Sequence, residues 1–269
     1  MRKLITLMFL SFVATIGFTQ NAQDQFYVFK KDWSPAKDFN SATYFMQMVK
    51  DNDSVFICRY YQKFGPMVRQ ESYKDSGLSI PHGFFAWYNN KGIADSSGYV
   101  IDGRKTSVWN YFKNDTKAYM TMWYDKGRWE KTENHLTNLV TYADGRVDTL
   151  EKKTTAKTKQ QGDTGVNVTQ IEAQFQGGPA GWQNYIVRNL HIPDRLLSIG
   201  HGGPVTVEFL IDKEGNVKDV SLRQSLEWSA DAEAIRLIKS SPKWTPAEQD
   251  GRKVYYRQVQ SITMAITRD

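Results

Sequence analysis

The sequence predicts a protein of two domains: an N-terminal all-β region of aromatic hairpins and a smaller C-terminal α+β domain. Aromatic side chains make up 13% of the 269 residues, with eight Trp and fourteen Tyr, and such residues favour pleated, half-buried strands. Residues 151–169, EKKTTAKTKQQGDTGVNVT, contain almost no large apolar side chain. They cannot bury enough surface to offset the entropy of ordering, so we expect a linker there. The domains are therefore expected at 24–150 and 170–269.

The first residues predict export. Arg2 and Lys3 precede an apolar run, and polar sequence containing Ala22 follows it. A basic start and an apolar run of about fifteen residues are typical of a secretory signal peptide and short for a membrane span. We expect residues 1–22 to be a signal peptide and the mature chain to lie in the periplasm or cell envelope. If the signal is not cleaved, it would instead anchor the chain in the inner membrane.

In the N-terminal region, aromatic pairs alternate with turn residues. Trp87 and Tyr88 precede the turn NNKG, and Trp109 follows about twenty-two residues after Trp87. Trp123 and Tyr124 precede a Lys-Gly turn. Aromatics at pleated positions and Asn/Asp-Gly turns with positive φ predict pairs of short strands joined by tight turns. The spacing resembles MORN-like repeats of the YwqK type from about Tyr60 to Trp129, although Ser107 stands where such repeats usually place a glycine.

Two other features of this region carry expectations of their own. Tyr44, Met48 and Val49 lie at helical offsets, which predicts a short helix or an irregular cap. Cys58 is the single cysteine and lies in an apolar run. With no intrachain partner, we expect it to be a buried small hydrophobic residue and not a redox or catalytic thiol.

The C-terminal region predicts a helix, two strands, a second helix and a last strand. Trp182, Tyr185, Ile186, Asn189 and Leu190 share one face of the first helix, which Pro193 should end. The strand GPVTVEFLID places its apolar residues on one side and turns Thr206 and Glu208 away from that side. The turn KEGN, with Gly215 in the left-handed conformation, should return the chain as an antiparallel strand. This order predicts a small antiparallel sheet with the helices on one face.

The second helix and the last strand complete this domain. Ser229 can cap the helix, Asp231 and Glu233 suit the positive end of its dipole, and Pro242 should end it. We expect Trp244 to lock the helix end against the sheet. The structural residues of this segment are Trp244, Pro246, Gly215 and Gly251. The turn EQDGRK, which contains Gly251, should aim a single last strand that begins at Lys253.

These residues carry a second resemblance. The hairpin GPVTVEFLIDKEGNVKDV and the element PKWTPAEQDGRK, in this order, are similar to the C-terminal domain of the TonB energy-transducer family. The similarity covers about 90 residues and depends on both elements occurring in order. Ile192 and Pro193 stand where the family often has a Tyr-Pro pair, which weakens any contact with a receptor plug made through that tyrosine.

The resemblance implies that the last strand pairs with an extended segment of an outer-membrane transporter or another envelope protein. An unpaired strand edge offers backbone donors and acceptors with little demand on the partner's sequence. The expected partner-binding edge consists of Lys253, Val254, Tyr255, Tyr256, Arg257, Gln258, Val259 and Gln260. Lys253 and Arg257 should discourage self-pairing and favour an acidic or polar peptide.

Energy transduction is a weaker expectation than docking. A transducer needs a retained inner-membrane helix and usually a long Pro-rich reach across the periplasm. Here the signal looks cleavable. Residues 151–169 contain no proline, and a segment of about nineteen residues is too short to cross that compartment even when fully extended.

Several classes of function lack a sequence signal. The four histidines, His82, His135, His191 and His201, are scattered and form no metal-binding motif. No nucleophile elbow, dinucleotide fingerprint, phosphate-binding loop or calcium loop is present. The net charge is +6 without a dense Lys/Arg block, which does not favour a nucleic-acid partner. We therefore expect no enzyme activity, no catalytic residues, no metal and no cofactor.

Two alternative functions stay open. The chain could be a structural or adhesive envelope protein that binds through its aromatic β-repeats, with the C-terminal domain as a scaffold or homodimerisation unit. It could also be a peptidoglycan-binding module, because a basic and aromatic surface suits glycan strands.

Overall fold

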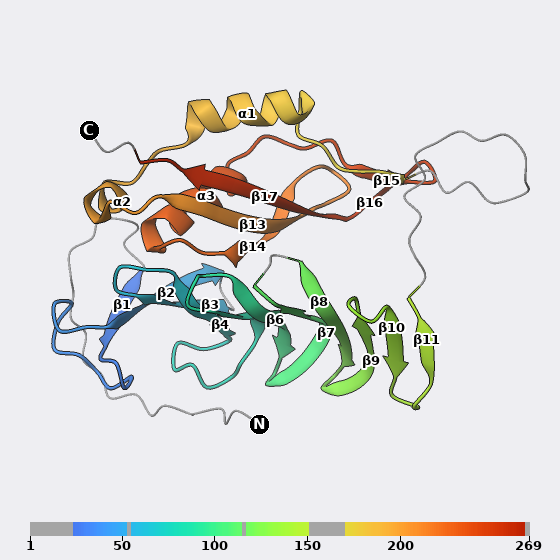
Figure 1. The fold of residues 1–269 in the computed structure, drawn as a ribbon, viewed down its shortest axis with the longest axis horizontal. Coiled ribbons are helices and arrows are strands. Elements are labelled where there is room, and N and C mark those ends of the chain that lie inside the picture. The colour runs from blue at the N-terminus through green and yellow to red at the C-terminus, as the bar shows by residue number, and fades with distance from the viewer. Residues whose placement is uncertain (1–23, 53–54, 115–116, 151–169, 267–269) are drawn as a thin grey trace, which may run out of the picture.

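A computed structural model describes residues 24–52, 55–114, 117–150 and 170–266. The predicted signal peptide and the predicted linker lie outside these residues. Figure 1 shows a long antiparallel sheet below and a smaller unit of helices and strands above it. Each unit has its own strand order, and the two meet along one face of the long sheet.

The long N-terminal sheet contains eleven strands in sequence order, β1 to β11, each antiparallel to the next. The strands are β1 (Gln25–Phe29), β2 (Tyr44–Asn52), β3 (Val55–Gln62), β4 (Met67–Tyr73), β5 (Gly83–Tyr88), β6 (Ala94–Ile101), β7 (Arg104–Phe112), β8 (Ala118–Asp125), β9 (Arg128–Asn134), β10 (Leu139–Tyr142) and β11 (Val147–Thr149). The expected hairpins are present, and they join into one continuous meander.

Turn chemistry accounts for the tight connections of this sheet. Asp102 and Gly103 both have positive φ between β6 and β7, as do Lys126 and Gly127 between β8 and β9. Ser107, at the position where the repeats usually have glycine, also has a positive φ of 55°. It lies in an irregularity of β7, where the register with β6 shifts. A left-handed residue at a bulge explains why glycine suits that position.

The expected helix around Tyr44 is wrong, because this segment forms strand β2. Met46 is fully buried on one face of the sheet and Phe45 is 4% exposed on the other. Because both faces of β2 carry buried side chains, apolar and polar residues do not alternate along it, and the sequence lacks the usual strand pattern. The spacing of Tyr44, Met48 and Val49 therefore resembles that of a helix. Cys58 is buried, as expected, and burial raises the pKa of its thiol to about 12.

The C-terminal unit contains three helices and two small sheets. The helices are α1 (Gly178–Asn189), α2 (Asp194–Ile199) and α3 (Trp228–Lys239), and the strands are β12 (Gln170–Ile171), β13 (Gly203–Ile211), β14 (Val217–Gln224), β15 (Ala247–Gln249), β16 (Arg252–Val254) and β17 (Tyr256–Met264). One sheet has the order β14-β13-β17 and the other β12-β15-β16. The α+β class and the small antiparallel sheet therefore agree with the expectation.

Helix α3 ends at Lys239, shortly before Pro242, as expected. The structure corrects three other details of this unit. The short helix α2 after Pro193 was not expected. The cap of α3 is Glu227, whose side chain accepts from the backbone of the first turn, and not Ser229. The last strand is divided, because β16 pairs with β15 and only β17 joins the main sheet.

The two units share one hydrophobic core. Phe45, Tyr61 and Phe112 of the long sheet belong to the same buried cluster as Val207 and Trp228 of the C-terminal unit. Trp228 makes an edge-to-face contact with Phe26 at 5.5 Å between ring centroids. The domain boundaries at 24–150 and 170–269 stay predictions, but the described residues pack as one body.

Polar contacts reach from the long sheet to the backbone at the end of β14. The Ser225 amide donates to the Gly92 carbonyl at 2.8 Å, and the Met67 amide donates to the Ser225 hydroxyl at 2.7 Å. The Tyr88 hydroxyl donates to the Leu222 carbonyl at 3.0 Å. These contacts give hydrogen-bond partners to backbone N–H and C=O groups at the end of β14, which water would otherwise have to hydrate.

Asp231 carries a buried carboxyl group at this junction. It lies in the first turn of α3 and is fully buried. Its oxygens accept from the Ser225 hydroxyl at 2.5 Å and from the Leu226 amide at 2.9 Å. Burial raises the pKa of Asp231 to about 8 despite these bonds, and the neighbouring charge of Glu227 adds to the shift. Tyr61 lies beside it, and burial also raises the pKa of that phenol.

The close approach at Gly92 yields a test of the junction. A Cβ atom there would lie 2.1 Å from the Ser225 carbonyl oxygen, whereas a Cβ at Gly103 would meet nothing within 4 Å. Both glycines have nearly the same φ, +75° and +77°, so an alanine causes about the same backbone strain at either position. We expect Gly92→Ala to lower the free energy of unfolding by about 3 kcal/mol more than Gly103→Ala, measured by urea unfolding. Equal losses would show that the junction does not need this contact.

Asp231 predicts a pH dependence of stability. Its pKa is raised in the folded state, so folding takes up a proton and the folded state loses stability as pH rises from about 4 to about 8. The full effect is on the order of 5 kcal/mol. Asp231→Asn should flatten this part of the curve of unfolding free energy against pH, measured by urea unfolding from pH 4 to 9. An unchanged slope in the variant would contradict the assignment.

Candidate partner-binding edge

The sheet β14-β13-β17 has two edges that differ in their surroundings. At the β14 edge, Ile93 of the long sheet forms an antiparallel bridge with Gln224, next to the Ser225 and Leu222 contacts. Figure 1 shows β14 as the strand of this sheet nearest the long sheet. On its other edge, β17 pairs with β13 alone, and no described strand lies beside it. The N-terminal sheet thus occupies the C-terminal end of the β14 edge and leaves the β17 edge open.

Strand β17 is long and regular. Its nine residues pair with β13 without a register shift, from Gly203 opposite Met264 to Ile211 opposite Tyr256. Alternate residues of an antiparallel edge strand point their backbone N–H and C=O groups outward. This edge therefore offers a row of regularly spaced donors and acceptors.

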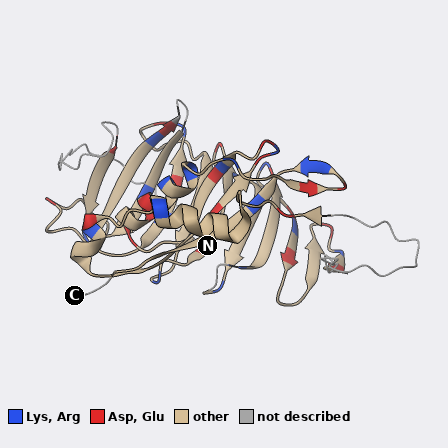
Figure 2. Cartoon of the chain, turned by 90° about the horizontal axis from the view of Figure 1, so that it is seen from above, with Lys and Arg blue, Asp and Glu red and all other residues tan. Residues whose placement is uncertain are grey.

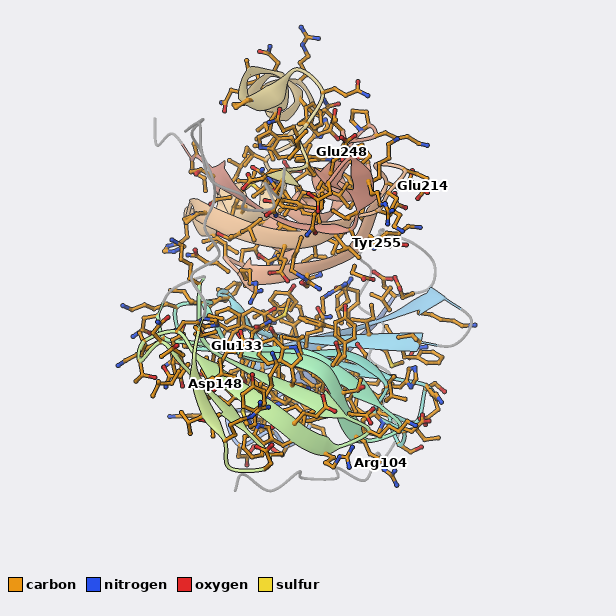
Figure 3. The ribbon with its side chains drawn as sticks, turned by 90° about the vertical axis from the view of Figure 1, so that its right-hand side faces the viewer. Arg104, Glu133, Asp148, Glu214, Glu248 and Tyr255 are labelled. Carbon is orange, nitrogen blue, oxygen red and sulfur yellow. The ribbon has the colours of Figure 1, made fainter. Side chains whose placement is uncertain are left out.

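The eight residues predicted to form the edge lie in three places. Lys253 and Val254 belong to β16, where they pair with β15, and Tyr255 lies between the strands with 59% of its surface exposed. Figure 3 shows Tyr255 at the side of the C-terminal unit, near Glu214. The remaining five, Tyr256, Arg257, Gln258, Val259 and Gln260, lie in β17. The expectation of one strand from Lys253 is therefore wrong, because the Asp250-Gly251 turn first closes a short hairpin.

The predicted structural residues lie behind this edge. Trp244 is 3% exposed, and the centroid of its ring lies 5.2 Å from the centroid of the Phe209 ring in β13. Its amide donates to the Gly215 carbonyl at 2.9 Å. Gly215 and Gly251 both have positive φ, 85° and 71°. Pro246 lies between the bridge of Thr245 to Gln174 and the start of β15. Trp244 thus packs on β13 shortly after the end of α3, and its backbone amide ties it to the turn at Gly215.

Glu208 joins the open edge to the covered one. Its carboxylate is 4% exposed and accepts from Arg257 Nη1 of β17 at 2.6 Å. Its other oxygen accepts from Arg223 Nε of β14 at 2.5 Å, and the Arg223 guanidinium lies 4.3 Å from the Phe112 ring centroid in the long sheet. The sequence places Glu208 on the face away from the helices, but nothing in it shows that the N-terminal sheet covers that face.

The positive charges of the predicted edge have acidic neighbours. Arg257 pairs with Glu208, and Lys253 stands directly opposite Glu248 in the hairpin. Figure 2 shows basic and acidic residues interspersed over the visible face, without a large area of one sign. The expected preference for an acidic peptide is weakened at Arg257, whose guanidinium is already paired with Glu208.

Other kinds of site have no support in the described part of the chain. There, no group of three or more His, Cys, Asp and Glu side chains is placed to hold a metal ion. None of the helices in the described residues has the length and apolar character that a membrane span needs.

Comparison with known families bears on the C-terminal unit. Residues 188–263 match the family described as Gram-negative bacterial TonB protein C-terminal. The match spans every element from α2 to β16 and all but the last residue of β17. Proteins of this family act in the cell envelope, where the domain takes part in transport-associated contacts with outer-membrane transporters. Residues 188–263 are thus similar to the C-terminal domain of TonB proteins.

The other comparisons find nothing further. No curated protein matches the chain, and no solved structure matches it. The resemblance of the N-terminal sheet to MORN-like repeats stays a prediction.

The buried position of Glu208 predicts a large effect of neutralising it. Glu208→Gln would leave the guanidinium groups of Arg223 and Arg257 without their carboxylate, and breaking a buried pair costs roughly 3 kcal/mol. Glu214→Gln, at an exposed turn, is the matched control and should change stability by less than about 0.5 kcal/mol. Urea unfolding of both variants measures the difference, and similar small losses would show that the Glu208 pairs contribute little.

Proposed function

We propose that the chain is an envelope protein-binding module that docks an extended segment of a partner on the open edge of β17. The partner proposed is an outer-membrane transporter, and the observation that carries the proposal is the asymmetry of the two sheet edges. A docked segment would add a fourth strand beside β17. Its backbone would satisfy the outward row of donors and acceptors.

The other described sheet edges support this choice by contrast. Strand β11 has three residues and carries Asp148, and β12 and β16 have two and three residues. Near β1, the chain folds back so that Phe29 bridges to Pro35. Short strands, charges and prolines are the usual protection of an edge against pairing. Strand β17 has nine residues and one charged side chain, Arg257, which is paired with Glu208.

In this proposal the N-terminal sheet determines which edge is available. It occupies the end of β14 through Gly92, Ile93 and Tyr88, so a partner strand has one place to add. The proposal assigns docking in the periplasm or cell envelope. Support of energy-dependent transport is its extension and requires the chain to be retained at the inner membrane.

A second candidate function rests on the opposite face of the long sheet. Phe85, Val100 and Trp109 are buried there under partly exposed rings, and every member of this cluster comes from β4 to β8 of the sheet itself. The Lys105 ammonium lies 4.1 Å from the Trp109 ring centroid. Aromatic rings with a nearby cation suit an adhesive or glycan-binding surface, which corresponds to the alternative in which the β-repeats bind.

Hydrogen exchange of the full-length protein distinguishes the two candidates. Synthetic peptides with the sequences of transporter N-terminal segments are added, and amide exchange is measured across the chain. We expect amides of residues 256–264 to gain protection, because a docked strand takes up their outward N–H groups. Peptides that bind without protecting β17 would overturn the proposal, as would the absence of binding by any of them. Protection of β5 to β8 by purified sacculi would support the second candidate.

A further inference from the structure

The chemistry around β17 restricts which segment can dock there. An added strand places its side chains directly opposite those of β17, on the same two faces, with Cβ atoms about 4.5–5.5 Å apart. The residues on each face of β17 therefore determine what the opposite residue of the partner must be. The two faces of this strand differ clearly.

On the face directed away from the helices, β17 presents small and aliphatic side chains. Val259, Ser261 and Thr263 are exposed, and 45% of the Val259 surface is accessible. Arg257 is the fourth member of this row, and its guanidinium is held by Glu208 at 2.6 Å. A partner strand would remove the Val259 isopropyl group from water, which favours an aliphatic residue opposite it.

On the face directed toward the helices, β17 presents two amides. Gln258 and Gln260 are half-buried and lie beside Phe209 and Val207 of β13, which are fully buried. Within the described ranges, neither glutamine side chain makes a hydrogen bond to another residue. A docked strand would cover both amides, so their donors and acceptors would need partners on that strand.

The cation of β17 is already engaged by a carboxylate of the chain itself. The guanidinium of Arg257 already donates to the Glu208 carboxylate, which is 4% exposed and which it shares with Arg223. Lys253 lies in the neighbouring hairpin, opposite Glu248. A carboxylate of the partner would lose water when the strand docks. The one cation of β17 that could compensate it, Arg257, is already engaged by Glu208.

We propose that the segment docking on β17 is uncharged and alternating, with hydrogen-bonding side chains opposite Gln258 and Gln260 and an aliphatic side chain opposite Val259. This inference rests on the proposed docking at β17 and adds the chemistry of the partner. The segment binds through its backbone and through neutral side chains, so its affinity depends little on ionic strength.

Three peptides of equal length test this pattern on the full-length protein. The first alternates Thr and Val, the second has Glu in place of each Thr, and the third has Lys there. Fluorescence anisotropy gives Kd at about 0.05 M and about 0.5 M salt, where screening of surface charges differs strongly. The Thr/Val peptide should bind at least about tenfold more tightly than either charged peptide, with less than about a twofold change between the salt conditions.

Variants of β17 locate the effect. The double variant Gln258→Val, Gln260→Val should raise the Kd of the Thr/Val peptide by about tenfold, because the Thr hydroxyl groups would then be buried without hydrogen-bond partners. The control is Gln183→Val at an exposed position of α1, which should leave Kd unchanged. An unchanged Kd in the double variant would overturn the assignment of the two amides.

The outcomes separate the inference from the docking it rests on. If the Glu peptide binds most tightly, weakens with salt and still protects the amides of β17 from exchange, the chemistry proposed here is wrong and docking survives. If no peptide, charged or neutral, protects β17, both the docking proposal and this inference fail.

Discussion

The contact between the long sheet and the end of β14 determines the rest of the arrangement. There the backbone of Gly92 approaches Ser225 so closely that only glycine fits, and the Tyr88 hydroxyl takes up the Leu222 carbonyl. A three-stranded sheet has two edges that can accept a strand. The N-terminal sheet occupies the C-terminal end of one edge, at β14, and leaves the whole length of the other edge, β17, open.

The same contact explains why the polar groups between the two units are buried. Glu208 and Asp231 are both buried. Asp231 lies beside Tyr61 of the long sheet, and Glu208 pairs with Arg223, whose guanidinium lies over the Phe112 ring of that sheet. Each is satisfied locally, Glu208 by two guanidinium groups and Asp231 by Ser225 and Leu226. Buried polar groups with specific partners fix one relative position of two packed layers, whereas apolar contacts alone would tolerate several.

Much of the fold could be predicted because local patterns determine it. The alternation in β13, the turn at Gly215 and the apolar stripe of α3 are visible in the sequence and agree with the structure. The division between β16 and β17 could not be predicted, since Arg252 to Met264 reads as one continuous extended run and tertiary pairing alone divides it. The strand β2 was missed because both its faces are buried.

The candidate site was only partly predictable for the same reason. Five of its eight expected residues lie on the open edge, because the motif that predicts the last strand is local. The neutralisation of Arg257 depends on Glu208, a residue far away in sequence whose burial comes from a third element. Long-range contacts of this kind leave no periodic signal in a single sequence.

Site-directed photo-crosslinking in cells tests the central claim most directly. A crosslinking residue is placed at Val259 on β17 and, for comparison, at Lys218, which is exposed on β14. The account predicts a crosslink to an outer-membrane transporter from position 259 and none from position 218. A crosslink from position 218 alone, or from neither position while the chain is bound to the transporter, would contradict docking at the open edge.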